Sequence, residues 1–175
     1  LLEYIAEPTD DRLYAIAQLI RGGVDLVLIY NRTKIDMFFL EKFKNIVEFE
    51  RVVEAAPMDI EVLREAKRMG FSDKFIGQLW GVSQHDMYLL REKNGIFPVY
   101  KMIDTCASEF SSYVPYFYST YEDENESLVS DKEKIVVLGS GPIRIGQGVE
   151  FDYSTVHAIW SIREAGYEAI IINNN

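Results

Sequence analysis

The sequence is poor in the residues that build disulfides and metal sites. Its 175 residues include one cysteine, Cys106, and two histidines, His85 and His157. A single cysteine cannot form a disulfide within the chain, so a reducing compartment is the default and we expect a cytoplasmic protein. No His, Cys or acidic residues have metal-ligand spacing on one element, and we therefore predict no metal site.

Long apolar runs and basic charge are also scarce. The longest apolar runs, such as 24–30 with its Asp25, are far too short to span a bilayer, and no signal peptide is visible. The 28 acidic residues outnumber the 18 basic ones and give a net charge of −10. Because phosphate binding needs a basic face, we expect neither nucleic acid nor a membrane as a partner. Hydrophobic residues make up 48% of the chain, which is typical of a globular protein.

Residues 1–95 carry the start and stop signals of about five short helices in antiparallel neighbour geometry. Capping residues precede apolar periodic segments, and glycine or proline follows them. The expected starts are Thr9 to Asp11, Thr33 with Asp36, Asp59, Ser72, and Ser83 with Asp86. The expected ends are Gly22 with Gly23, Pro57, Gly70, Gly81, and Asn94 with Gly95. The longest helix begins near Asp36, and its apolar positions are expected on one broad face: Phe38, Phe39, Phe43, Ile46, Val47 and Val53.

Residues 96–121 differ from the helical part because they are rich in aromatic residues and contain two prolines, Pro98 and Pro115. This composition indicates extended chain that is not a central strand, and we interpret it as an irregular arm laid over other surfaces. The acidic run 122–126 is interpreted as a solvated linker. We therefore place a domain boundary near residue 128.

The last forty-odd residues have the pattern of a βαβ unit. An apolar strand, 134–138, leads into a glycine-rich turn, a helical pattern and a second apolar strand, 168–172. The turn contains Gly139, Gly141, Arg144 and Gly146. Such a turn usually approaches a ligand, although glycines that only permit a tight turn and close packing are the alternative. Two parallel strands have open edges and little core, so we expect the start of a domain in a fragment of a longer protein.

Neither common nucleotide motif is complete in this turn. Arg144 stands where a dinucleotide fingerprint needs its third glycine, and Gln147 with Gly148 replaces the Lys-Ser or Lys-Thr of a phosphate-binding loop. The acidic residue that would hold a ribose is missing after the second strand. A truncated dinucleotide-binding oxidoreductase remains an alternative, which NAD binding would support. We expect His157 to be a packed, hydrogen-bonded side chain rather than a catalytic base. Cys106 is expected to be buried and inert.

Several long motifs resemble the large chain of carbamoyl-phosphate synthase. The stretch 138–153 reads LGSGPIRIGQGVEFDY and is similar to the opening of that chain's second, carbamoyl-phosphate-forming half. Residues 97–110, FPVYKMIDTCASEF, and 118–122, YSTYE, resemble its central region, as does the TKID helix start at 33–36. One departure is Ile143, where the family commonly has asparagine. The resemblance covers almost the whole chain.

The resemblance implies a mostly α fold, with a helical oligomerisation domain at 1–127 and the truncated first βαβ of a pre-ATP-grasp domain at 128–175. The parent enzyme would be a ligase that makes carbamoyl phosphate from bicarbonate, ammonia and two ATP, for arginine and pyrimidine synthesis. Its ATP and Mg (or Mn) would bind elsewhere, so no cofactor and no catalytic residue are expected here, and the fragment should be inactive alone. Implied partners are further copies of the chain, the other large-chain domains and a glutamine amidotransferase small subunit.

The family also implies a role for the turn beside the internal tunnel that carries carbamate. Gly148 and Glu150 match the small and acidic positions of its G-Q-x-x-E-F-D loop, so Glu150 would line the tunnel and Gly148 would keep it open. A stand-alone helical interaction module is a further alternative. The apolar faces of the strands are expected to be poorly ordered or covered by a neighbouring chain.

Overall fold

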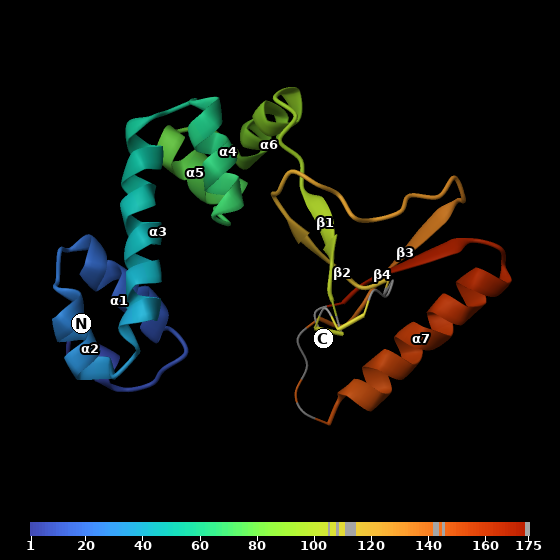
Figure 1. Cartoon of the computed structure of the whole chain (residues 1–175), viewed down its shortest axis with the longest axis horizontal. Helices are drawn as coiled ribbons and strands as arrows, with labels where there is room; N and C mark the ends of the chain where they lie inside the picture. Colours follow the sequence, from blue (N-terminus) through green and yellow to red (C-terminus); the bar gives the residue numbers. More distant parts are fainter. Residues whose placement is uncertain (105, 108, 111–114, 142–143, 145, 174–175) are drawn as a thin grey trace. The chain divides into compact units, whose positions relative to one another are not determined.

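The computed structural model describes residues 1–104, 106–107, 109–110, 115–141, 144 and 146–173. Tyr113 of the aromatic segment and Ile143 of the glycine-rich turn lie outside the described residues. The chain forms two compact units, Leu1–Ser127 and Leu128–Asn175 (Figure 1).

The first unit begins with seven helical elements. They are η1 (Tyr4–Ala6), α1 (Arg12–Arg21), α2 (Leu26–Thr33), α3 (Met37–Ala55), α4 (Ile60–Arg68), α5 (Asp73–Trp80) and α6 (Gln84–Lys93). The mostly helical fold expected for this part of the chain is therefore confirmed.

Most of the helices start at the capping residues that the sequence predicts. The Asp36 carboxylate accepts a hydrogen bond from the Phe38 amide at 2.8 Å, and Asp59 accepts from two amides of α4. Ser83 accepts from the Asp86 amide at 3.1 Å and its hydroxyl donates to the Asp86 carboxylate at 2.6 Å. The pair resembles a capping box, except that the carboxylate accepts from the serine hydroxyl and not from the serine main-chain amide. These side chains satisfy amides that have no partner within their own helix.

Helix α2 is not among the helices expected from the sequence, because most of its eight residues are apolar and show no clear helical period. The available signal was Asp25, whose carboxylate accepts a hydrogen bond from the Val27 amide at 2.7 Å. Lys34 ends the helix in the left-handed conformation (φ 58°), where glycine is more usual.

The long helix α3 connects two separate hydrophobic cores. The first core lies around η1, α1, α2 and the first half of α3, and consists of Ile5, Ala15, Ile16, Leu19, Ile20, Ile29, Leu40 and Val47. The second lies around the end of α3 and α4 to α6, and consists of Val53, Leu63, Ala66, Phe71, Ile76, Trp80, Met87 and Ile96. The two cores contact different sides of the helix. The prediction of one broad apolar face on α3 is therefore wrong, and Phe38 and Phe39 remain 57% and 56% exposed.

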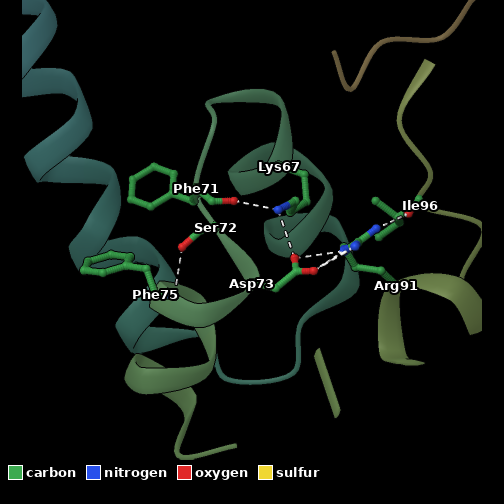
Figure 2. Close-up of polar contacts among 7 residues, drawn as sticks. All are labelled: Lys67, Phe71, Ser72, Asp73, Phe75, Arg91 and Ile96. Carbon is green, nitrogen blue, oxygen red and sulfur yellow. Dashed lines mark hydrogen bonds and ion pairs between the residues drawn. The ribbon is translucent and has the colours of Figure 1, made fainter. Parts of the chain in front are cut away.

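A buried ionic cluster joins three helices of the second core (Figure 2). Lys67 of α4, Asp73 of α5 and Arg91 of α6 meet there, with Lys67 and Arg91 only 6% and 7% exposed. Lys67 also donates to the carbonyl of Phe71 at 2.7 Å, and Arg91 donates to that of Ile96 at 2.9 Å. Each buried charge thus has a partner, as burial requires.

The aromatic segment after α6 forms a two-stranded antiparallel ribbon. Strand β1 (Val99–Met102) pairs with β2 (Phe117–Thr120), so that Val99 lies opposite Thr120. The extended conformation was expected, but the prediction of an irregular arm is wrong, because the two segments pair with each other. Pro98 and Pro115 lie outside the paired residues, where a missing amide removes no ladder hydrogen bond.

The second unit contains β3 (Lys134–Leu138), α7 (Gly148–Glu164) and β4 (Glu168–Ile172). The two strands are parallel, with Lys134 opposite Glu168, and α7 packs against them (Figure 1). The βαβ unit expected from the sequence is thus present. Its apolar strand residues are widely exposed, including Val136 at 50%, Leu138 at 76% and Ile172 at 60%.

Candidate functional site

The glycine-rich turn begins where β3 ends. The Gly139 amide donates to the carbonyl of Ile172 at 2.8 Å, which continues the pairing of β3 with β4. Gly141 and Gly146 have φ of +73° and +96°. Side chains are unfavourable in this left-handed region, so the turn needs glycine at both positions.

Asn173, which follows β4, lies directly against the turn. A Cβ at position 139 would stand 2.5 Å from the Asn173 side-chain oxygen, so any larger residue there would displace this amide. The Asn173 amide nitrogen in turn lies 3.4 Å from a carboxylate oxygen of Asp152 on α7. No local sequence signal indicates this contact, because it depends on the pairing of β3 with β4.

Arg144 and Gln147 close the second half of the turn. The Arg144 amide donates to the Gln147 side-chain oxygen, and the Gln147 amide donates to the Arg144 carbonyl, both at 3.1 Å. Gln147 is the last residue before α7. The Arg144 side chain is exposed, so its contribution to the turn comes from its main chain.

Gly148 and Glu150, the two positions singled out from the sequence, lie in the first turn of α7. Gly148 is half-buried and Glu150 is exposed. A carboxylate at this end of a helix is favoured by the partial positive charge of the unpaired amides. Among the described residues the Glu150 carboxylate has no hydrogen-bond or ionic partner, so it is open to one from outside.

The remaining reactive side chains do not form a catalytic set. His157 is exposed on α7, with its ring centre 4.1 Å from that of Tyr153 and 4.9 Å from that of Trp160. The expectation of a packed histidine is wrong, because His157 is exposed and these two ring contacts are with residues of its own helix. Cys106 is half-buried rather than buried. Within the described residues no group of acidic, His or Cys side chains could hold a metal ion, and none of the helices there is long and apolar enough to cross a bilayer.

The helical unit contains a groove of about 420 Å³ between α1, α2 and α3. Apolar residues line it, among them Ile20, Val24, Met37 and Val47. Charged residues of both signs, Asp25, Lys44, Glu48 and Arg51, line it as well. Lys44 and Glu48 form an ion pair at 3.5 Å. Such a groove, with apolar residues and charges of both signs, suits contact with a protein surface that is also apolar and also carries both positive and negative side chains.

Exposed apolar side chains lie beside the groove. Val27, which also lines it, is 53% exposed, and its neighbour Leu28 is 54% exposed. Both are in the first turn of α2. Large exposed apolar side chains next to a groove are typical of interaction surfaces.

Two family models match the chain. Residues 1–95 match the carbamoyl-phosphate synthetase large chain, oligomerisation domain. Residues 131–175 match the carbamoyl phosphate synthase preATP-grasp domain. The first match therefore falls in the helical unit and the second in the βαβ unit. The first match alone covers more than half of the chain, and the chain therefore belongs to the carbamoyl-phosphate synthetase large-chain family, whose members are ligases.

Proposed function

We propose that this chain is the central piece of a carbamoyl-phosphate synthase large subunit, in which it associates with further copies of itself and connects the two synthetase halves. The parent enzyme would join bicarbonate, two ATP and ammonia released from glutamine by a separate small subunit. The observation that carries the proposal is the match of residues 1–95 to an oligomerisation domain. It is supported by the open groove on this part of the chain, which apolar and charged residues line.

The groove of α1, α2 and α3 is the proposed contact surface. In a two-fold symmetric dimer the same patch meets its own copy, so it must be self-complementary. The charges of the groove are compatible with this condition, because it carries both signs: Asp25 and Glu48 could face Arg51 and Lys44 of the second copy, with Lys44 and Glu48 exchanging their present ion pair for contacts across the interface. Val27 supplies an exposed apolar side chain that would enter the facing hollow.

The test is the solution mass of the chain, measured by light scattering over a range of concentrations. A dimer or larger assembly that dissociates on dilution supports self-association. A monomer at every concentration would contradict self-association by this piece alone and would assign assembly to other domains of the parent enzyme.

For the second unit we propose the carbamate-tunnel role. Gly148 would leave room for the passage and Glu150 would line it, since a carboxylate can hold water and orient a polar passenger. The open Glu150 carboxylate in the first turn of α7 supports this proposal. ATP and Mg would bind to other domains of the parent enzyme, and we expect no synthesis by this chain alone.

The match of residues 131–175 to a preATP-grasp domain removes the reason for considering a dinucleotide-binding oxidoreductase. A stand-alone interaction module would share the self-association proposed here. It would differ in having no role for the glycine-rich turn, which the Gly148 variant described below tests.

A further inference from the structure

The acidic run 122–126, which the sequence suggests is a solvated linker, is bound along the first unit. Tyr121, directly before it, is fixed by the ionic cluster. Its ring centre lies 4.9 Å from the Lys67 ammonium and 5.6 Å from the Arg91 guanidinium, and it packs against the second hydrophobic core. The cluster carries two cations and one carboxylate, so an aromatic face on it is electrostatically favourable.

The following residues attach to α4 and to the free edge of β1. Asp123 forms an ion pair with Arg68 of α4. Asn125 accepts a hydrogen bond from the Tyr100 amide at 2.9 Å, and Glu126 accepts one from the Met102 amide at 2.6 Å. The main-chain amide of Glu126 donates to the Tyr100 carbonyl at 2.9 Å. The segment thus satisfies backbone groups that an edge strand leaves unpaired.

Lys101 strengthens this attachment. Its ammonium lies 3.3 Å from the Glu126 carboxylate and 3.7 Å from that of Glu124. The hydrogen bonds from the Met102 amide and Lys101 hold the pKa of Glu126 below its usual range. The same contacts therefore keep Glu126 charged to a lower pH than an ordinary glutamate.

On the other side of the connection, Ser130 already belongs to the second unit. It forms a hydrogen bond with the Glu168 carboxylate, and the Lys134 ammonium donates to its carbonyl. Ser127 is bound by the Asn125 side-chain amide, with its hydroxyl 2.8 Å away. Between these two serines are Leu128 and Val129, which are 76% and 80% exposed and have no polar partner among the described residues.

We infer that residues 121–126 are an anchor and that the hinge between the two units is the pair Leu128–Val129. A hinge of two residues limits the distance between the Cα atoms of Ser127 and Ser130 to roughly 10 Å, since an extended residue spans about 3.5 Å. A free linker from residue 122 onward would allow about three times that reach. Because the tether is short, the first unit constrains where the second unit can go. If the self-association proposed above holds, assembly of the helical units would limit the freedom of the preATP-grasp units.

Backbone ¹⁵N relaxation of the whole chain tests this inference residue by residue. We expect order parameters near 0.85 at residues 121–126, as in rigid backbone, and below about 0.6 at 128 and 129. Low values throughout 121–130 would overturn the anchor. High values at 128 and 129 would overturn the hinge.

A double variant, Asn125→Ala with Glu126→Ala, tests the cause of the ordering. Asp131→Ala is the matched control, because it removes one exposed carboxylate next to the hinge but outside the anchor. We expect order at 122–126 to be lost in the double variant only. Cleavage after Glu122 and Glu124 by a glutamate-specific protease should become roughly tenfold faster, since local opening then costs less.

The helix content by circular dichroism should be the same in all three proteins, which excludes general unfolding. Unchanged order and unchanged cleavage in the double variant would overturn the role assigned to these two side chains, because the segment would then be held without them. Neither measurement depends on whether the chain self-associates. A failed anchor and a failed self-association proposal are therefore separate results.

Discussion

Arg91 donates hydrogen bonds to both carboxylate oxygens of Asp73, at distances of 2.7 to 2.9 Å, although the two residues are 18 positions apart on different helices. Lys67 approaches the same carboxylate at 2.9 Å from a third helix. This pairing holds α4, α5 and α6 together and provides the surface on which Tyr121 packs.

Replacing Asp73 with asparagine should destabilise the first unit by about 3–5 kcal/mol, because it leaves two buried cations without a counter-charge. Urea unfolding followed by circular dichroism measures the loss. Asp86→Asn is the control with the same charge change at an exposed site, and it should cost at most about 1 kcal/mol. Equal losses in the two variants would show that the cluster adds little stability.

The same carboxylate predicts an acid-sensitive stability. Burial raises the pKa of Asp73, but the hydrogen bonds and charges of Arg91 and Lys67 outweigh it and leave the pKa lowered. A group with a lowered folded-state pKa stabilises the fold fully above its unfolded value, near 3.9 for Asp. This contribution should be lost as the pH falls from about 4 through the lowered folded-state pKa. The pH dependence of unfolding between about 4 and 2.5 should therefore be weaker in Asp73→Asn than in the wild type.

Gly146→Ala should destabilise the second unit by about 1–2 kcal/mol, because a side chain is strained at φ of +96°. Gly148→Ala is the matched control two residues later. Gly148 lies in α7 without a positive φ, so alanine should be neutral or slightly stabilising there. Hydrogen exchange of the β3 and β4 amides measures both effects. Equal protection in the two variants would contradict the assigned role of Gly146.

Val27→Asp should weaken self-association by at least about tenfold, since it would bury an unpaired charge in the proposed contact. Light scattering on a dilution series of wild type and variant gives the comparison. Leu89→Asp on α6 is the control, because Leu89 is exposed to a similar extent, at 45%, and lies far along the chain from the groove. If both variants associate like the wild type, the groove is not the interface, even if self-association itself holds.

In the complete enzyme, Gly148→Leu should raise the ATP consumed per carbamoyl phosphate formed by severalfold, because a bulky side chain would obstruct the proposed tunnel. The measurement is parallel assay of ADP and carbamoyl phosphate. Val149→Leu adds similar bulk at the neighbouring position, which is 81% exposed in this chain, and should leave the ratio unchanged. An unchanged ratio in Gly148→Leu would contradict the tunnel role.

The starts of α3, α4, α5 and α6 could be predicted because each depends on a capping residue within three positions of the amide that it satisfies. Asp36, Asp59, Ser72 and Ser83 all cap as expected. Local signals were less useful for α2, whose apolar residues lack a clear period. The glycines of the candidate site could be identified from the sequence. The contact of Asn173 with Gly139 could not, because it depends on the pairing of β3 with β4.

The sequence by itself determined the family, the helical and βαβ character of the two parts and the glycines of the turn. These features rest on long motifs or on interactions between residues close in the chain. Only the tertiary structure decided that α3 serves two cores on different sides and that Asp73 meets both Lys67 and Arg91. It also decided that the acidic run binds to the edge of β1, where composition alone suggests a free linker. The physical reason is that pairing between distant side chains depends on how helices and strands come together, which local periodicity and charge do not encode.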